Sequence, residues 1–272
     1  MAFLTEPEPP RGMAVPVAPG ISRIVAANPG PMTYHGTNTY LIEDPDGAIV
    51  VDPGPDDPAH VQTILRATGG RIARLLLSHS HRDHVGALPA LRAATGALAC
   101  GFRHCQDPGF SPDLALDDGD TVADLTALHT PGHAADHLCF ARADGIIFTA
   151  DHVMTWSTSV ISPPAGDMAA YLTSLRRLIG RDDRLLLPGH GPPLANPRAY
   201  LLDLLIHRKR REASVLAAIK TAPRTPAELA DMLYTPLNPH LRAAAERILL
   251  AHLLKLHAEG RAESTDGIWR AT

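Results

Sequence analysis

Apolar residues follow two patterns along the chain, with short runs in the first two thirds and longer helical repeats afterwards. Short runs bounded by glycine, proline and aspartate predict β-strands. These runs are Ile21–Val25, Asn38–Ile42, Ala48–Asp52, Ile72–Ser78, Leu98–Gly101, Thr121–Leu128, Leu138–Ala141, Ile146–Thr149 and Leu185–Leu187. Amphipathic segments near residues 57–67, 85–94 and 168–179 predict helices between the strands. Two strand-rich halves with intervening helices predict a layered α/β sandwich.

Helical repeats replace the strand-like runs after Pro197. Long helices are predicted over residues 198–220 and 240–258. Between them, Thr225-Pro-Ala-Glu supplies an N-cap, a proline at the first helical position and a glutamate at the third, which predicts a short helix. The tail from residue 261 to 269 predicts a hairpin turning at Asp266-Gly267. Three helices and a hairpin predict a winged-helix domain.

These patterns divide the chain into three parts. Residues 1–20 are rich in proline and predict an extended N-terminal arm on the surface. Residues 21–196 are expected to form the sandwich domain. Residues 197–272 are expected to form a linking helix and the winged-helix domain.

Composition excludes several classes of protein. The 272-residue chain is long enough for a substantial core, and its three cysteines are odd in number and form no CxxC pair. A disulfide framework and a thiolate zinc knuckle are therefore excluded, and a reducing, cytoplasmic location is expected. The first residues lack the pattern of a signal peptide, and no apolar run approaches about 18 residues, so no membrane association is expected.

The densest group of polar side chains follows the predicted strand that ends at Ser78. His79-Ser80-His81-Arg82-Asp83-His84 holds four metal-ligand side chains within six residues. Alternation at a strand end places His79 and His81 on one side, and the turn that follows lets Asp83 and His84 face a second position nearby. The sequence thus predicts two adjacent, half-built metal sites. The alternative is a polar loop without metal, but such a cluster would repel itself when protonated.

Three further residues lie where predicted strands end. His133 lies in His-Thr-Pro-Gly-His, Asp151 in Phe-Thr-Ala-Asp-His and His190 in Leu-Pro-Gly-His-Gly. Taken singly, each is typical of a hydrogen-bonded turn residue. Together with the cluster they can complete two shells of imidazole and carboxylate, which suit zinc or iron.

The order HxHxDH, then separate His, Asp and His, resembles the metallo-β-lactamase superfamily from about Ile21 to Pro193. The resemblance implies an αββα sandwich with a dinuclear, hydrolytic metal site at the edges of the sheets. It also implies a first metal bound by His79, His81 and His133, and a second bound by Asp83, His84 and His190, with Asp151 bridging.

A closer similarity is to the β-lactamase-like protein 2 family. It rests on Pro29-Gly30, Gly36–Tyr40, His81–His84, His129–His133, Asp136-His137, Pro188–Gly191, His207-Arg208 and Arg211-Glu212. One departure is Ala150 before Asp151, where many relatives have glycine. Alanine should cost little there unless the residue needs a positive φ.

A centre of this kind would hold two divalent ions, with zinc expected first and iron or manganese as alternatives. It would generate a metal-bridging hydroxide near neutral pH and favour anionic or strongly polarised substrates. Asp83 is the candidate catalytic residue, because its carboxylate can accept a hydrogen bond from the hydroxide and orient it.

Three functions compete on the sequence. The first is a phosphodiesterase or endoribonuclease acting on single-stranded RNA, and the second is a thioester or other ester hydrolase, like glyoxalase II or an acyl-thioesterase. The third is a non-enzymatic winged-helix regulator with a degenerate hydrolase domain. The presence of all seven candidate ligands argues against degeneration, and the family resemblance places RNA slightly ahead of thioesters.

Other residues have both a functional and a structural interpretation. His137 and His152 could protonate a leaving group or orient ligands, or they could be buried, hydrogen-bonded histidines. Tyr34, Asn38 and Thr39 lie in a segment similar to one near the family's site mouth, or they form a structural turn.

The linking helix carries a basic run whose candidate polyanion contacts are Arg208, Lys209, Arg210 and Arg211. The alternative is a solvated helix face, because successive helical residues point in different directions. The helix over 240–258 is apolar on most sides. This favours burial against the sandwich domain or in a homodimer over contact with nucleic acid.

Overall fold

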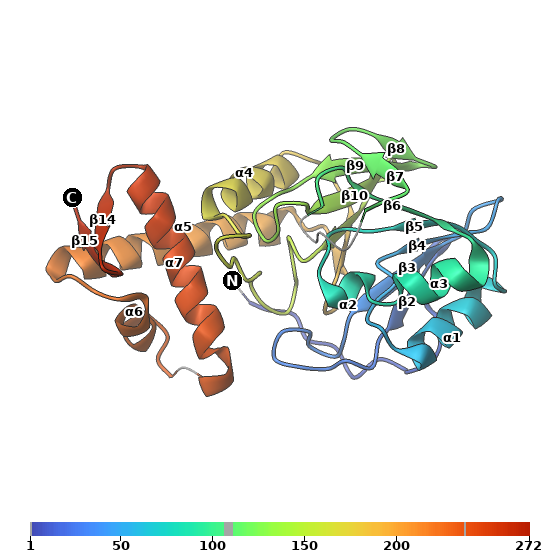
Figure 1. Cartoon of the computed structure of the whole chain (residues 1–272), viewed down its shortest axis with the longest axis horizontal. Helices are drawn as coiled ribbons and strands as arrows, with labels where there is room; N and C mark the ends of the chain where they lie inside the picture. The colour runs from blue at the N-terminus through green and yellow to red at the C-terminus, as the bar shows by residue number, and fades with distance from the viewer. Residues whose placement is uncertain (1, 106–110, 237) are drawn as a thin grey trace.

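The protein contains two mixed β-sheets packed face to face (Figure 1). The computed structural model describes residues 2–105, 111–236 and 238–272. The first sheet holds, in spatial order, β1 (Val15–Ala18), β2 (Ile21–Val25), β3 (Asn38–Ile42), β4 (Ala48–Val51), β5 (Ile72–Leu76), β6 (Leu98–Phe102) and β7 (Leu114–Leu116). The second holds β13 (Leu194–Ala195), β12 (Leu185–Pro188), β11 (Ile146–Ala150), β10 (Leu138–Arg142), β9 (Leu125–His129) and β8 (Thr121–Val122).

Alternation along the central strands builds two apolar layers at once. On β3, Tyr40 and Ile42 face the second sheet and pack in one cluster with Phe140 and Phe148. Leu41, between them, belongs to a separate cluster on the outer face of the first sheet. Both faces of these strands are therefore buried, which explains why the runs are apolar throughout rather than alternating.

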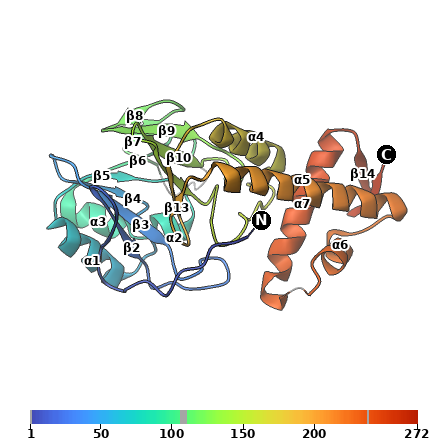
Figure 2. The same ribbon diagram turned by 180° about the vertical axis from the view of Figure 1, so that it is seen from behind.

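Helices cover both outer faces of the sandwich (Figures 1 and 2). On the first sheet, α1 (Pro58–Thr68) and α3 (Leu88–Thr95) pack their apolar sides, including Ile64 and Leu91, against the strands. On the second sheet, α4 (Met168–Ile179) and α5 (Arg198–Thr221) do the same with residues such as Leu175 and Leu204. The order helix, sheet, sheet, helix confirms the predicted αββα sandwich.

Several predicted elements differ in extent. The helix expected over 85–94 is divided into α2 (Arg82–Val85) and α3, because the amide of Ala87 donates to the carbonyl of Gly54 and Gly86 packs tightly against Asp56. The run 121–128 is a hairpin that turns at Ala123, with φ of 51°. The first 20 residues include β1, which adds an edge strand to the first sheet by pairing with β2.

The winged helix consists of α6 (Pro226–Leu233), the 3-10 turn η1 (Pro239–Leu241), α7 (Arg242–Ala258) and the hairpin of β14 (Ala262–Thr265) and β15 (Ile268–Ala271). The predicted capping box is present, since Thr225 and Glu228 exchange side-chain to backbone hydrogen bonds. The hairpin turns at Asp266 and Gly267, which both have positive φ as the sequence predicts.

Two helices connect the winged helix to the sandwich. The first half of α5 contributes Leu201 to the cluster against the second sheet, and its second half contributes Val215 to the core of the winged helix. Likewise α7 places Leu249 in the winged-helix core and Ile248 in the sandwich cluster. The expected burial of this apolar helix against the sandwich is confirmed, while the division of the chain at residue 197 stays a prediction.

None of the helices in the described residues combines the length and the apolar character needed to cross a membrane.

Candidate metal centre

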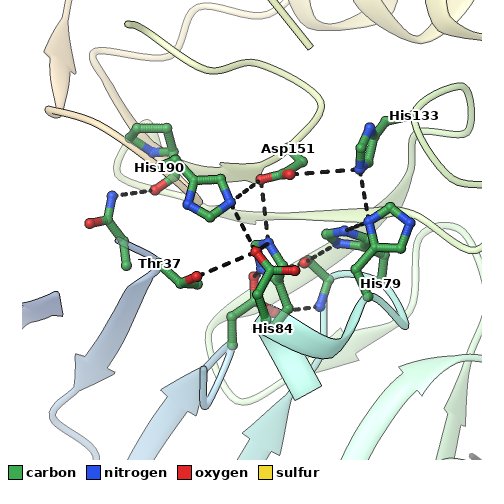
Figure 3. Close-up of polar contacts among 12 residues, drawn as sticks. Thr37, His79, His84, His133, Asp151 and His190 are labelled. Carbon is green, nitrogen blue, oxygen red and sulfur yellow. Dashed lines mark hydrogen bonds and ion pairs between the residues drawn. The ribbon is translucent and has the colours of Figure 1, made fainter. Parts of the chain in front are cut away.

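All seven candidate ligands meet at one edge of the sandwich (Figure 3). They come from loops that follow β5, β9, β11 and β12 and from the short helix α2. Because these strands end on the same side of the two sheets, residues up to 111 positions apart in sequence lie within contact distance. The group is His79, His81, Asp83, His84, His133, Asp151 and His190.

One part of this group, the histidine half, consists of His79, His81 and His133. His81 Nδ1 lies 2.9 Å from His79 Nε2 and 3.1 Å from His133 Nε2. The other ring nitrogen of His133 donates to the carbonyl of Val160 at 2.6 Å. His79 Nδ1 donates to the hydroxyl of Ser78 at 2.9 Å, because the Ser78 proton is itself given to a carboxylate. Three inward nitrogens therefore share at most one proton, and a cation would satisfy all three.

The other part, the carboxylate half, consists of Asp83, His84 and His190. Asp83 Oδ2 lies 3.5 Å from His84 Nε2 and 3.3 Å from His190 Nε2. The outer nitrogens are again occupied, since His84 Nδ1 donates to Asp52 at 2.9 Å and His190 Nδ1 donates to the Gly36 carbonyl at 3.3 Å. Neutral rings in these tautomers turn lone pairs toward a carboxylate, an arrangement that requires a cation or extra protons between them.

Asp151 lies between the two halves (Figure 3). One carboxylate oxygen is 3.4 Å from both His84 Nε2 and His190 Nε2, and the other is 3.6 Å from His133 Nε2. This position fits a bridging ligand. A side chain at Gly189 would place its Cβ 2.6 Å from the Asp151 carboxylate, so glycine is required beside it.

The backbone at Ala150 sets the direction of Asp151. Ala150 has a φ of 41°, in the left-handed region that favours glycine. Its carbonyl accepts a hydrogen bond from the Gly189 amide at 2.9 Å, which fixes the end of β11 against the loop of His190. Alanine is therefore costly at position 150, because this residue adopts a positive φ.

Protonation is opposed in one half of the centre and favoured in the other. Burial and the neighbouring imidazole rings lower the pKa of His79 well below its usual value, and burial with His133 lowers that of His81 to about 4. Burial also opposes protonation of His190, but the carboxylates of Asp151 and Asp83 raise its pKa to about 9. Burial opposes protonation of His84 as well, but the carboxylates of Asp83, Asp151 and Asp52 raise its pKa above the usual value.

These donors fit divalent metal. They fall into groups of three whose ligand atoms lie within 4.8 Å of one another, and they combine imidazole nitrogen with carboxylate oxygen. Buried atoms that have no hydrogen-bond partner, including His84 Nε2 and Asp151 Oδ1, point into the centre. Unpartnered polar atoms at such a site are expected where an ion supplies the missing interaction.

Asp52 is a structural residue of the centre that the sequence did not single out. Its carboxylate accepts hydrogen bonds from the Ser78 amide at 2.8 Å, the Ser78 hydroxyl at 2.7 Å and His84 Nδ1 at 2.9 Å. It thereby orients one histidine in each half, His84 directly and His79 through Ser78. An aspartate that directly follows an apolar strand and precedes Pro-Gly was the only local signal.

Three residues of the predicted site mouth have structural contacts. Asn38 donates to the carbonyls of Pro188 and Gly191 and so supports the loop that carries His190. Thr39 is buried and hydrogen-bonded to His60 at 2.9 Å. Tyr34 exchanges hydrogen bonds with the backbone of Glu6 in the N-terminal arm.

His137 and His152 are fully buried behind the centre. His137 is hydrogen-bonded to Thr130 at 2.9 Å and stacks against His79 at 5.2 Å between ring centroids. His152 packs against Tyr171, and burial lowers its pKa to about 3. Neither ring lines the cavity at the metal centre, so neither is placed to donate a proton to a leaving group. The contact of His137 with His79 fits a role in orienting that ligand.

A cavity of about 390 Å³ opens over the candidate ligands. His81, Asp83, His133, Asp151 and His190 form its floor, and its walls include Met32, Met154, Val160 and Pro163. Arg247 of α7 also lines it and donates to the Ser162 hydroxyl at 2.8 Å. No salt bridge found among the described residues involves Arg247, so its charge is available to a bound group.

The four candidate polyanion contacts on α5 do not form one surface. Arg208 is 2% exposed, donates to the carbonyl of Ser159 and lies 5.0 Å from the ring centroid of Tyr171. Arg211 donates to the Leu233 carbonyl at 2.6 Å and stacks on Tyr234. Lys209 and Arg210 are exposed. The prediction that Arg208 contacts a polyanion is wrong, because α5 turns this residue toward the sandwich.

Comparison with known proteins agrees with this architecture. Residues 32–104 and 102–190 match the metallo-beta-lactamase superfamily, and residues 225–269 match the beta-lactamase associated winged helix domain. The crystal structure of a beta-lactamase domain protein from Burkholderia ambifaria superposes with a TM-score of 0.83 at 24% identity, covering 97% of this chain and 95% of that one.

Two relatives match over nearly the whole chain. A beta-lactamase-like protein 2 homolog of Drosophila melanogaster is 28% identical over 89% of this chain and 89% of its own length. An atrochrysone carboxyl ACP thioesterase, AgnL7, of Paecilomyces divaricatus is 28% identical over 92% of this chain and 83% of its own length. With the superfamily match covering more than half of the sequence, the chain belongs to the metallo-beta-lactamase superfamily and is a hydrolytic enzyme with a C-terminal winged helix.

Proposed function

We propose that the enzyme hydrolyses acyl thioesters and binds two divalent ions, zinc first, through the seven residues of the candidate centre. The observation that carries this proposal is the cavity over the centre, whose floor is built of ligands and whose walls are largely apolar. Such a cavity suits a small substrate with one reactive polar group and an apolar remainder.

Divalent ions held by these donors would lower the pKa of bound water to about 7, supply the nucleophile and stabilise the oxyanion that forms at the carbonyl. The protein's own contribution is to hold the donors in place. Asp83 lines the cavity, and although burial and the carboxylate of Asp151 oppose its ionisation, the imidazoles of His84 and His190 lower its pKa. It is therefore ionised near neutral pH and can accept a proton from the attacking water. Thr37 donates to Asp83 at 3.4 Å and fixes its orientation.

Two observations favour thioesters over RNA as the substrate. Arg208 is buried and Arg211 is engaged by Leu233 and Tyr234, so only Lys209 and Arg210 of the four predicted polyanion contacts are exposed. A relative that matches 92% of this chain carries the name of an acyl carrier protein thioesterase. Cleavage of single-stranded RNA is therefore the alternative activity that the test must distinguish from thioester hydrolysis.

We also propose a cytoplasmic location. Cys100 and Cys139 are buried, free thiols, and burial raises the pKa of Cys100 to about 11 and that of Cys139 to about 12. Buried, protonated thiols resist exchange, which suits a reducing compartment.

A side-by-side assay tests the function. The metal-loaded protein is given acyl thioesters and single-stranded RNA, each with and without chelator, and Asp83→Asn serves as the inactive control. Hydrolysis of thioesters at a kcat/KM at least about tenfold above that for RNA, lost with chelator and in the variant, is expected. Cleavage of RNA alone would overturn the proposal in favour of a nuclease, and turnover of neither substrate would overturn it in favour of another polar ester.

A further inference from the structure

A second hollow lies between the sandwich and the winged helix. Its volume is about 180 Å³. The sandwich side is formed by Met32, Met154, Trp156 and Val160, and the other side by Leu241, Ala244 and Ile248 of the η1–α7 segment. We call this hollow, defined by these residues, the interdomain groove. Ser157, Thr158 and Tyr234 also line it, but most of its lining is apolar on both sides, which is unusual for a surface that is left to water.

The interdomain groove is continuous with the cavity over the metal centre. Met32, Met154 and Val160 line both spaces. Val160 is also tied directly to the ligands, because its carbonyl accepts a hydrogen bond from His133 Nδ1 at 2.6 Å. A molecule whose reactive group lies over the centre therefore finds an apolar extension beside it, on the side of α7.

The walls are fixed before any molecule enters. Trp156 stacks on Tyr34 with ring centroids 5.1 Å apart, and Gly191 packs so closely that an added Cβ would lie 2.6 Å from its indole. On the opposite side, Ile248 is 7% exposed and belongs to the apolar cluster of α4 and α5. A preformed groove loses little conformational freedom when it is filled.

From this arrangement we infer that the interdomain groove binds the acyl chain of the substrate, so that the winged helix is a wall of the active site. This inference rests on the proposed function, since it assumes that the group hydrolysed at the centre carries an acyl chain. The occupant is an apolar chain attached to that group, because the residues shared by the groove and the cavity, Met32, Met154 and Val160, are all apolar and no charged residue is found among the described lining of the groove.

The first test varies the length of the chain. Burial of each methylene favours binding by about fourfold, so kcat/KM for straight-chain thioesters should rise by up to about fourfold per methylene until the groove is filled. Equal kcat/KM for short and long acyl groups would contradict binding of the acyl chain in the groove, but it would not contradict thioester hydrolysis.

The second test closes the groove with a side chain. Ala244→Phe, and Ala244→Leu as a smaller change, should lower kcat/KM for long-chain thioesters more than for acetyl thioesters and so remove the preference for long chains. Ala243→Phe is the matched control, because Ala243 is the preceding, exposed residue of α7 and does not line the groove. Thermal unfolding of each variant shows whether it folds. If Ala243→Phe also lost the preference for long chains, the assignment of the acyl chain to the interdomain groove would be contradicted.

The third test needs no catalysis. A long-chain acyl thioether, which the enzyme cannot hydrolyse, should change the tryptophan fluorescence of the wild type and change that of Ala244→Phe less. In Trp156→Phe, where only Trp269 remains, no change is expected. Binding of the thioether together with failure to hydrolyse any thioester would retain the groove and reject the proposed function. Hydrolysis of thioesters without a change in Trp156 fluorescence would reject the groove alone.

Discussion

The histidine half and the carboxylate half of the centre are built around the same loop, yet they respond to protons in opposite ways. His81 has its pKa lowered to about 4, whereas His190 has its pKa raised to about 9. His190 is buried and His81 is the more exposed ring, so the extent of burial does not explain why His190 has the higher pKa. The difference lies in the neighbours, since His81 faces other imidazoles and His190 faces Asp83 and Asp151.

This contrast indicates different strategies for holding a cation. In the histidine half, His79 and His81 have lowered pKa values, so an ion enters without displacing an extra proton from either ring. The carboxylate half offers more negative charge, and an ion there must compete with protons that the same charge attracts. Charge therefore strengthens binding in one half at the cost of sensitivity to pH.

The largest effect on the two halves is expected when the residue between them, Asp151, is removed. Asp151→Ala should empty the carboxylate half and leave the histidine half with its three imidazoles, so that bound metal falls from about two ions to about one. With the nucleophile and oxyanion poorly held, kcat/KM should fall by at least about 10³-fold. Metal analysis and kinetics measure both effects. Equal loss of both ions would contradict the assignment of ligands to the two halves.

A smaller effect is expected from Asp52→Asn. This change weakens the hydrogen bond that orients His84, and the affinity of the carboxylate half should fall by about 10- to 100-fold. Ser78→Ala acts mainly on the other half, because it removes the hydroxyl that contacts His79 while the hydrogen bond between His84 and Asp52 remains. Competition with a chelator measures the two affinities, and Asp46→Asn, an exposed aspartate far from the centre, is the control. If Ser78→Ala weakened the ion of the carboxylate half as strongly as Asp52→Asn does, the two halves would not be independent.

The dependence on pH sharpens the comparison without a substitution. Below pH 9 His190 is protonated in the metal-free protein, and the pKa of His84 is raised as well, so an ion in the carboxylate half displaces at least one proton and its apparent affinity should rise at least about tenfold per pH unit from pH 6.5 to 8.5. His81 is unprotonated throughout this range, so affinity in the histidine half should stay nearly constant. Metal titrations at three pH values test this. Parallel slopes for both ions would remove the contrast.

The smallest effect concerns the strand end that aims Asp151. Ala150→Gly should relieve a left-handed alanine and stabilise the protein by about 1 kcal/mol, measured as the free energy of unfolding. The control is Ala141→Gly in β10, where φ is negative and glycine should destabilise. If Ala150→Gly destabilised the protein to the same degree, the strain at this position would be absorbed elsewhere.

The sequence predicted the ligand cluster because each ligand follows a strand, and strand ends are visible as the limits of apolar runs. Asp52 occupies the same kind of position but escaped notice, since an aspartate before Pro-Gly is typical of an ordinary turn. Its partners Ser78 and His84 lie 26 and 32 residues away in sequence, and only the pairing of β4 with β5 brings them together.

The basic run and the interdomain groove show what a linear pattern cannot resolve. Arg208 and Lys209 are adjacent and equally basic, but helical rotation buries the first and exposes the second. The groove joins a loop around Trp156 to Ala244, almost ninety residues later, and neither segment carries a local signal of the other. The apolar character of α7 did predict a buried helix, because that property needs no knowledge of the partner.

The course of α5 has a consequence for how the protein unfolds. One continuous helix places Leu201 and Leu204 in the core of the sandwich and Val215 and Ile219 in the core of the winged helix. Disorder in either core would remove the anchoring of the shared helix and expose apolar side chains in the other. The two lobes therefore behave as one cooperative unit, which melts in a single transition rather than in two successive steps.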